Sequence, residues 1–235
     1  MLSETTFADY QAQSANASFS DWLVLSAGAS WLNAINHPFT QAVGDDTISD
    51  ADYARYLLED YSFIKDLASS LGYLVAKAPT MEAKGVLAAF LAQLTSSEND
   101  YFIRSFAALG IDEQTYQGAG QGEVTRATAA TLLSAAGKAK YEDGLACLLC
   151  AEWVYREWCT REARKPRPER FYLAEWIELH DNPAFLRFVD WLRAEVDRVG
   201  AILPEWRQRE VRERFVRMCE LEAAFFSAVS PEAQA

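Results

Sequence analysis

Apolar residues recur at helical spacing along nearly every long segment of the chain. Positions three and four apart share one face of an α-helix, whereas a half-buried strand alternates apolar and polar positions. In the segment that begins at Tyr53, Asp60 shares one face with Tyr56 and Phe63. No segment shows convincing strand alternation, so the pattern predicts an all-α fold.

Capping residues and helix breakers divide this pattern into separate helices. Pro38 disfavours helical geometry at His37 and ends the first helix there, while Ser49 or Asp50 and then Thr80 are candidate N-caps for the next two. The predicted helices cover Ser18–Asn36, 53–78, 81–110, Glu123–Ala136, Lys140–Ala163, Glu169–His180, Pro183–Val199 and Glu205–Val229.

The segment 111–122 is predicted to be a loop, and it contains the glycine-rich stretch "GAGQG". A phosphate-binding loop would require an apolar strand before the glycines and Lys-Ser or Lys-Thr after them. Both are missing, so we interpret this stretch as a connector. Proline and glycine form no linker anywhere and no segment repeats, which predicts one helical domain over residues 1–235.

Composition narrows the possible partners. Half of the 235 residues are hydrophobic, which is enough for one sizeable core. The formal net charge is −12, and no stripe of basic residues is flanked by aromatic ones, which argues against nucleic acid as a partner. The first residues, "MLSETTFADYQ", do not have the pattern of a signal peptide, and no apolar run is long enough for a membrane span. We expect a soluble cytoplasmic protein without a membrane partner.

The cysteines and histidines do not form a metal-binding pattern. Cys147, Cys150 and Cys159 lie on one predicted helix, where the first two are too local for an ordinary disulfide, so reduced thiols are expected. Cys219 is distant in sequence, and a tetrahedral zinc site needs ligand pairs from two places. Neither histidine follows a glutamate by three positions, as a di-iron bundle would require. No metal site is predicted.

The stretch "CLLCAEWVYREWC", residues Cys147–Cys159, contains a candidate acid. Glu152 and Tyr155 lie on one face of the predicted helix. If aromatic neighbours desolvate Glu152, its affinity for a proton rises, as a general acid near neutral pH requires. Alternatively, Glu152 is a surface residue paired with Arg156. Periodicity alone leaves both interpretations open.

Two further acids lie on aromatic-rich helices. Asp60 stands among apolar and aromatic residues, where an unpaired carboxylate is costly. Either a hydrogen bond between helices or a ligand with two parallel donors, such as an aminopyrimidine, would satisfy it. Glu222 borders the apolar stripe of the last helix, and spacing does not decide whether it faces solvent or a pocket. Together the three acids indicate a flat polar ligand.

Three motifs in order resemble the TenA family, also called the thiaminase II family, over nearly the whole chain. They are "HPFTQAVGDDTISDADYARYLLEDYSFIKDLA", "LLCAEWVYREW" and "ELEAAFF". The resemblance implies an all-α, heme-oxygenase-like multi-helix bundle that needs no cofactor. It also implies a homo-oligomer, either a dimer or a tetramer, and a small-molecule aminopyrimidine as the ligand.

The resemblance also implies roles for individual residues. Asp60 falls at the aspartate that binds the amino group and ring nitrogen of the pyrimidine, and Phe63 at an aromatic residue that lines the ring. Tyr155 matches a tyrosine near the reacting centre, and Glu222 matches the catalytic glutamate. His180 stands where one branch of the family has a tyrosine; it could equally cap backbone carbonyls at its helix end.

The chain departs from the best-known branch of the family at its nucleophile. That branch has a cysteine four residues before the matched tyrosine, where this chain has Ala151. Cys150 is one residue early, turned by about 100° around the helix. Glu152, one residue late, resembles a second, cysteine-less branch in which a glutamate takes over.

The resemblance to this second branch implies a salvage hydrolase of aminomethyl and formylaminomethyl pyrimidines. The product is 4-amino-5-hydroxymethyl-2-methylpyrimidine, and thiamin is expected to be a poor substrate. Glu152 and Glu222 would divide the acid and base roles, in an order that the sequence leaves open. Two alternatives remain: a non-catalytic pyrimidine-binding or regulatory protein, and a heme or quinone relative with His37 as proximal ligand.

Overall fold

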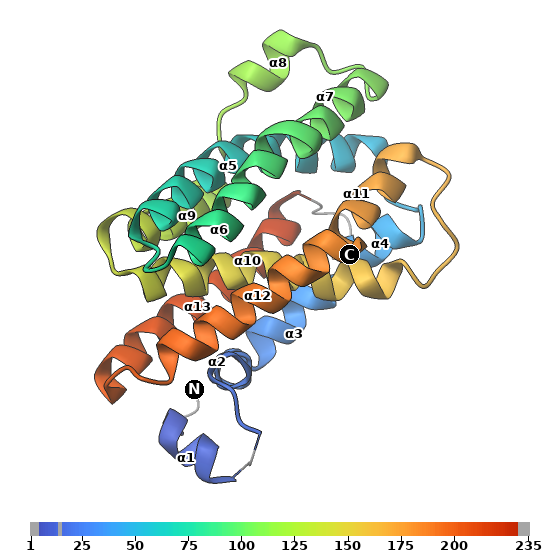
Figure 1. The fold of residues 1–235 in the computed structure, drawn as a ribbon. Coiled ribbons are helices and arrows are strands. Elements are labelled where there is room, and N and C mark those ends of the chain that lie inside the picture. The colour runs from blue at the N-terminus through green and yellow to red at the C-terminus, as the bar shows by residue number, and fades with distance from the viewer. Residues whose placement is uncertain (1–4, 14–15, 230–235) are drawn as a thin grey trace.

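Helices form all of the regular structure in the part of the chain that the computed structural model describes, residues 5–13 and 16–229 (Figure 1). The all-α prediction is therefore confirmed. In chain order the elements are α1 (Phe7–Gln13), α2 (Phe19–Ala27), α3 (Ala29–Ile35), α4 (Pro38–Gly44), α5 (Asp50–Lys77), α6 (Met81–Gln93), the π-helical turn η1 (Leu94–Glu98), α7 (Asn99–Ala108), α8 (Glu113–Gly118), α9 (Glu123–Leu133), a second π-helical turn η2 (Ser134–Lys138), α10 (Tyr141–Glu162), α11 (Phe171–Asp181), α12 (Pro183–Gly200) and α13 (Glu205–Val229).

Helix α10 lies in the middle of the bundle, and it contacts α3, α4, α5, α9, α11, α12 and α13 (Figure 1). Every residue from 143 to 154 is buried. The sequence explains this position, because a helix that is apolar around its whole circumference can only be stable inside a protein. A polar side chain in this part of α10, such as that of Glu152, is therefore inside the bundle.

The N-caps of the long helices follow the sequence. Ser49 accepts a hydrogen bond from the backbone N–H of Asp52 at the start of α5, and Thr80 accepts one from Ala83 at the start of α6. Each cap satisfies a donor that the first helical turn leaves free. Ser49, rather than Asp50, is the cap of α5.

The first predicted helix, Ser18–Asn36, is wrong as one element. Its two halves, α2 and α3, meet at Gly28, whose φ of 52° lies in the left-handed region that glycine adopts without steric cost. Pro38 does not only end a helix but also begins α4, because a proline at the first position needs no hydrogen-bond donor. The short helices α1 and α8 are also absent from the prediction, and α8 lies within the predicted loop.

The predicted helix 81–110 is interrupted by η1. Directly before Glu98, the hydroxyls of Thr95, Ser96 and Ser97 donate to carbonyl oxygens four residues earlier, at 2.8, 2.6 and 3.3 Å. Such side-chain bonds compete for the carbonyls of the helix and bend it. The wider π-helical turn changes which later residues face the core, and it places Glu98 inside the protein.

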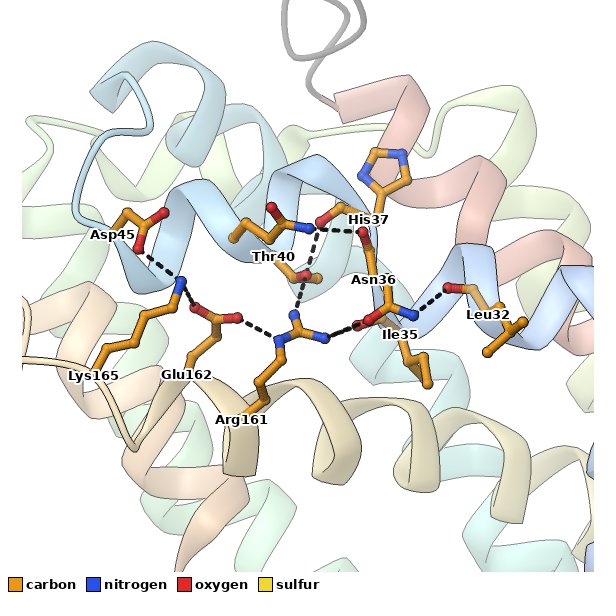
Figure 2. Close-up of polar contacts among 10 residues, drawn as sticks. Leu32, Ile35, Asn36, His37, Thr40, Asp45, Arg161, Glu162 and Lys165 are labelled. Carbon is orange, nitrogen blue, oxygen red and sulfur yellow. Dashed lines mark hydrogen bonds and ion pairs between the residues drawn. The ribbon is translucent and has the colours of Figure 1, made fainter.

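A buried ion-pair network joins the end of α10 to α3 and α4 (Figure 2). The Glu162 carboxylate, 1% exposed, pairs with Arg161 at 2.7 Å and with Lys165 at 2.6 Å. Arg161 also donates to Thr40, and Lys165 pairs with Asp45 at 2.7 Å. Because both cations reach residues of α4, the network holds α4 against α10.

Replacing Gly44 by alanine is expected to lower the free energy of unfolding by about 1–3 kcal/mol, the usual cost of overpacking. A Cβ atom at Gly44 would lie 1.9 Å from a carboxylate oxygen of Glu162, so the network would have to shift. Gly72→Ala, in the interior of α5 with nothing within 4 Å, serves as the control and should stabilise by about 0.5–1 kcal/mol. Urea unfolding of both variants measures the difference, and equal stabilities would contradict the prediction.

Within the residues described, no helix combines the length and the apolar character that crossing a bilayer requires.

Candidate active site

A cavity beside α10 brings together all of the site residues predicted from the sequence. It encloses about 530 Å³ of space, part of it continuous with solvent. The predicted residues that line it are Asp60, Phe63, Glu152, Tyr155, His180 and Glu222. Its other walls are mostly apolar and include Ile64, Leu67, Phe90, Leu94, Trp176 and Phe225. An apolar cavity with a few converging polar groups is typical of a small-molecule site.

Asp60 projects into the cavity from α5 and is 4% exposed. Tyr56, one turn earlier on the same helix, is a neighbour whose hydroxyl favours the ionised form of Asp60. One carboxyl oxygen, Oδ2, is buried and has no hydrogen-bond partner among the described residues. Burial raises the pKa of Asp60 to about 7. The anticipated bond between helices is therefore not formed, and one buried oxygen is free to accept a donor from a ligand.

Glu152 projects from α10 and is 6% exposed. Arg156 does not pair with it but forms an ion pair with Asp190 at 2.5 Å, so the surface interpretation of Glu152 is wrong. Burial raises the pKa of Glu152 well above its usual range, and nearby carboxyl groups, of which Glu98 has the largest effect, raise it further. At neutral pH, Glu152 therefore holds its proton in the free cavity.

Tyr155 lies one turn after Glu152, and its hydroxyl oxygen is 2.9 Å from that of Tyr56. Either hydroxyl can be the donor in this bond. The bond joins α10 to α5 one turn before Asp60.

Glu222 lines the cavity from α13 and is 4% exposed. Burial, supplemented by the charge of Asp60, raises the pKa of Glu222 to about 8. The sequence left open whether Glu222, at the border of the apolar stripe of α13, faces solvent or a pocket. Packing of α13 against α10 and α5 turns this border inward.

Glu98 is a further carboxyl group in the cavity, and it was not among the site residues predicted from the sequence. It lies at the end of η1, is 6% exposed, and burial together with the charge of Asp60 raises its pKa to about 8. Helical periodicity did not single it out, because the π-helical turn changes the periodicity just before it. The run Thr95-Ser96-Ser97 was the available signal for this turn.

His180 lines the cavity from α11, and its Nδ1 lies 2.9 Å from the carbonyl oxygen of Trp176. A carbonyl only accepts, so Nδ1 carries the proton and Nε2 is an acceptor. Burial lowers the pKa of His180 to about 4, so the ring is neutral at pH 7. His180 thus bonds a backbone carbonyl within its helix and also forms part of the cavity wall. No lysine or arginine is among the cavity-lining residues that the structure describes.

Cys150 lies outside the cavity lining, while its neighbour Ala151 is part of that lining. The Cys150 thiol is fully buried, and its Sγ is 3.3 Å from Sγ of Cys219 on α13. Burial raises the pKa of Cys150 well above its usual range. A nucleophilic cysteine needs the opposite, a lowered pKa and access to substrate. Cys219, far away in sequence, is its direct neighbour in space.

His37, the residue considered as a proximal heme ligand, lies outside this cavity lining. Its Nδ1 accepts a hydrogen bond from the backbone N–H of Phe39 at 3.1 Å, and its Nε2 is 3.0 Å from the hydroxyl oxygen of Ser227. Nδ1 thus caps α4, and Nε2 joins α4 to α13. Across residues 5–13 and 16–229, no group of three or more His, Cys, Asp or Glu residues is arranged to hold a metal ion.

The buried carboxyl groups predict that stability falls as pH rises from about 4.5 to about 8 and then levels off. The pKa of Glu222 is raised from 4.5 to about 8 in the folded protein. Its stabilising contribution is therefore complete below about pH 4.5 and is lost as pH rises through about 8. His180, whose pKa is lowered from 6.5 to about 4, changes stability in the opposite direction up to about pH 6.5, so the decline is measured between pH 6.5 and pH 8.

Melting temperatures measured across this range test the prediction. The wild-type protein should melt several degrees lower at the alkaline end, and Glu222→Gln should show a shallower decline because one buried acid is gone. Parallel curves for the two proteins would mean that Glu222 ionises as it does in the unfolded chain.

Comparisons with known proteins agree with this architecture. The aminopyrimidine aminohydrolase of Halalkalibacterium halodurans is 23% identical over 210 residues, which cover 89% of this chain and 94% of that protein. The solved structure of a TenA homologue from P. horikoshii superposes with a TM-score of 0.81 at 20% identity, covering 90% of this chain and 98% of that chain. A domain of unknown function from Shewanella denitrificans, described as having a heme oxygenase-like fold, gives 0.60 at 16% identity, covering 90% and 92%. The predicted heme-oxygenase-like bundle is confirmed.

The three motifs that resemble the family lie at the start, centre and end of the chain, so a family match should cover nearly its full length. The model of the TENA/THI-4/PQQC family matches residues 26–231. This match includes every residue of the cavity wall described above. The chain belongs to the TENA/THI-4/PQQC family.

Proposed function

We propose that this protein is an aminopyrimidine hydrolase of thiamin salvage, which forms 4-amino-5-hydroxymethyl-2-methylpyrimidine. The observation that carries the proposal is the convergence of Asp60, Glu152 and Glu222 in one aromatic-walled cavity. The family and the relative named aminopyrimidine aminohydrolase support the same activity. With an aminomethyl substrate, the bond between the exocyclic carbon and nitrogen breaks, and a bond from that carbon to a water oxygen forms.

Asp60 anchors the pyrimidine in this proposal. Its free Oδ2 accepts a hydrogen bond from the exocyclic amino group, and the other oxygen accepts one from the neighbouring ring nitrogen in its protonated form, so that two parallel hydrogen bonds orient the ring. Phe63 and the other aromatic walls pack against the faces of the ring and exclude water. A carboxylate in such a place is costly when unpaired, and this cost favours a ligand that supplies donors.

The two glutamates share the proton transfers. Glu152, whose pKa burial and neighbouring carboxyl groups raise well above its usual range, is the acid toward the departing nitrogen in this proposal. Glu222, whose pKa burial raises to about 8, is the base that activates water. With a formylaminomethyl substrate, the same water attacks the formyl carbon, and formate and the amine are the products.

Tyr155 and His180 complete the reacting centre. The hydroxyl of Tyr155 is hydrogen-bonded to that of Tyr56, which lies one turn before Asp60 on α5, so the reacting centre is held to the helix that carries the anchor. The acceptor Nε2 of the neutral His180 orients either water or the amine. Neither residue needs to change its charge during the reaction. No cysteine takes part, because the only thiol near the family position is buried against Cys219.

A product assay with three substrates in parallel tests the proposal. The aminomethyl and formylaminomethyl pyrimidines should both give the hydroxymethyl product, and thiamin should be turned over much more slowly. Binding of both pyrimidines without product would support the alternative of a non-catalytic pyrimidine-binding or regulatory protein. Rapid cleavage of thiamin would contradict the assignment to the cysteine-less branch.

We also propose that the enzyme is a cytoplasmic homo-oligomer, either a dimer or a tetramer. Several large apolar side chains are exposed on the single chain and provide material for subunit contacts: Leu25, Leu32, Tyr73, Met81, Ile202 and Trp206. Light scattering of the purified protein measures the subunit number, and a monomer at micromolar concentration would contradict this part of the proposal.

A further inference from the structure

Glu98 is a buried acid of the cavity to which the mechanism above gives no task. It reaches the cavity from η1, while Glu152 reaches it from α10, and both side chains are 6% exposed. Of the charged groups around Glu152, Glu98 has the largest effect. The two carboxyl groups thus line one cavity, and both are buried. No ion pair among the described residues includes either of them.

Among the described residues that line the cavity, the ionisable ones are acids, a tyrosine and a neutral histidine, with no lysine or arginine. The ionisable side chains that line it are Asp60 from α5, Glu98 from η1, Glu152 and Tyr155 from α10, His180 from α11 and Glu222 from α13. The residues from α6 and α9, among them Thr125 and Thr128, do not ionise. A buried group of acids without a counter-charge favours a ligand that brings a positive charge.

We propose that Glu98 is a specificity-determining residue which, together with Glu152, holds the leaving nitrogen of the substrate as an ammonium ion. This subsite selects an aminomethyl group over a hydroxymethyl or formylaminomethyl group. The inference rests on the proposed function, because it presupposes that an aminopyrimidine enters the cavity. Within that function, it names the preferred substrate as the free amine.

One proton moves from Glu152 to the amine, and one moves from the attacking water to Glu222. The proton of Glu152 moves to the amine, which becomes an ammonium ion beside the new Glu152 carboxylate, and the carboxyl group of Glu98 hydrogen-bonds to this pair. When the carbon–nitrogen bond breaks, its electron pair stays on nitrogen, which leaves as ammonia. Glu222 takes one proton of the attacking water, and the remaining hydroxyl forms the carbon–oxygen bond. A second acid at this place matters because an isolated ion pair is poorly solvated in a buried site.

Of the three ligands, only the amine becomes positively charged at this position. An alcohol offers no positive charge, and the formylated nitrogen is neutral, so neither gains from two acids at this position. The loss of Glu98 should therefore affect the amine selectively. A merely structural role in η1 would weaken all ligands alike, which makes the comparison between ligands decisive.

The test compares Glu98→Gln with the wild type in three measurements. For the aminomethyl pyrimidine, kcat/KM should fall roughly 10- to 100-fold, as expected for losing a hydrogen bond to a charged group. The inhibition constant of the hydroxymethyl product should change by less than about twofold. The alkaline limb of the pH–rate profile should move to lower pH, because Glu152 loses the like charge that has the largest effect on it.

Glu82→Gln is the matched control, because Glu82 is an exposed residue of α6 and the substitution changes the net charge equally. It should leave all three measurements within about twofold of the wild type. If Glu98→Gln does not fold, Glu98→Asp in the same assays keeps the acid but withdraws it from the amine, and it should weaken the amine selectively.

The outcomes separate the two proposals. Equal losses for the amine and the alcohol, or an unmoved alkaline limb, would overturn the role of Glu98 while the wild-type enzyme still turns over pyrimidines. Absence of turnover in the wild type would overturn the proposed function itself, and the ammonium subsite with it.

Discussion

Glu152→Gln is expected to lower kcat for the aminomethyl pyrimidine by about 10²- to 10⁴-fold, the usual contribution of a general acid. Glutamine has nearly the same shape but cannot give a proton to the leaving nitrogen. Because Asp60 and the aromatic walls are unchanged, KM should change far less than kcat. Steady-state kinetics of the purified variant measure both constants. The alkaline limb of the wild-type profile should also disappear, since the acid that titrates there is gone.

Two control variants show whether the effect belongs to Glu152. Glu220→Gln changes an exposed glutamate of α13, two positions from Glu222, and should leave kcat within about twofold. Cys150→Ser changes the residue nearest to the family's nucleophile position, and it should also retain turnover because that thiol lies outside the cavity lining. Full activity of Glu152→Gln together with an inactive Cys150→Ser would reverse our assignment.

The fold should tolerate Glu152→Gln, since no ion pair or hydrogen bond of the described residues depends on this carboxyl group. At alkaline pH the variant should be more stable than the wild type, because burying an ionised carboxylate is costly and the amide avoids that cost. Loss of activity with unchanged or raised melting temperature would separate a chemical role from a structural one.

Asp60→Asn is expected to have the second largest effect, a rise in KM of roughly 10- to 100-fold, corresponding to the loss of a hydrogen bond to a charged group. The asparagine oxygen can still accept a hydrogen bond from the amino group of the pyrimidine. Its NH₂ group, however, cannot accept a hydrogen bond from the protonated ring nitrogen. The binding of the hydroxymethyl product should weaken to the same extent, because Asp60 contacts the ring and not the leaving group. Titration calorimetry with the product measures this directly.

Asp66→Asn, six positions further along α5, is the matched control. Asp66 accepts a hydrogen bond from Gln121 at 2.7 Å and lies outside the cavity lining, and an asparagine oxygen can still accept that bond. Unchanged product affinity in Asp60→Asn would mean that the pyrimidine is anchored elsewhere. The contrast between Asp60, which should change the binding of every pyrimidine, and Glu98, which should change only that of the amine, distinguishes ring recognition from recognition of the leaving group.

Much of the candidate site was accessible from local patterns. Glu152 and Tyr155 are three positions apart on one helix, and helical geometry alone puts them on one face. The stretch from 144 to 151 has no polar side to turn toward water, which explains why α10 is central, whereas the burial of Glu152 was one of two open alternatives. Tyr56 and Asp60 are one turn apart on α5, so helical geometry makes them neighbours. These relations depend only on the helical repeat.

Other parts of the site depend on how helices meet, and the helical repeat contains no information about that. Glu222 stood at the border of an apolar stripe, and only packing of α13 against α10 and α5 turned it inward. Cys150 and Cys219 are 69 positions apart, yet their sulfur atoms lie 3.3 Å from each other. Glu98 was missed because η1 interrupts the regular repeat on which the prediction relied.

The sequence by itself determined the helical class, the caps at Ser49 and Thr80, and which residues share a face within α5 and α10. These features result from steric limits and hydrogen bonds between residues a few positions apart. The tertiary structure alone decided that acids from α5, η1, α10 and α13 meet in one cavity whose described lining has no lysine or arginine. Their raised pKa values follow from that meeting, because burial and like charge depend on neighbours in space rather than along the chain.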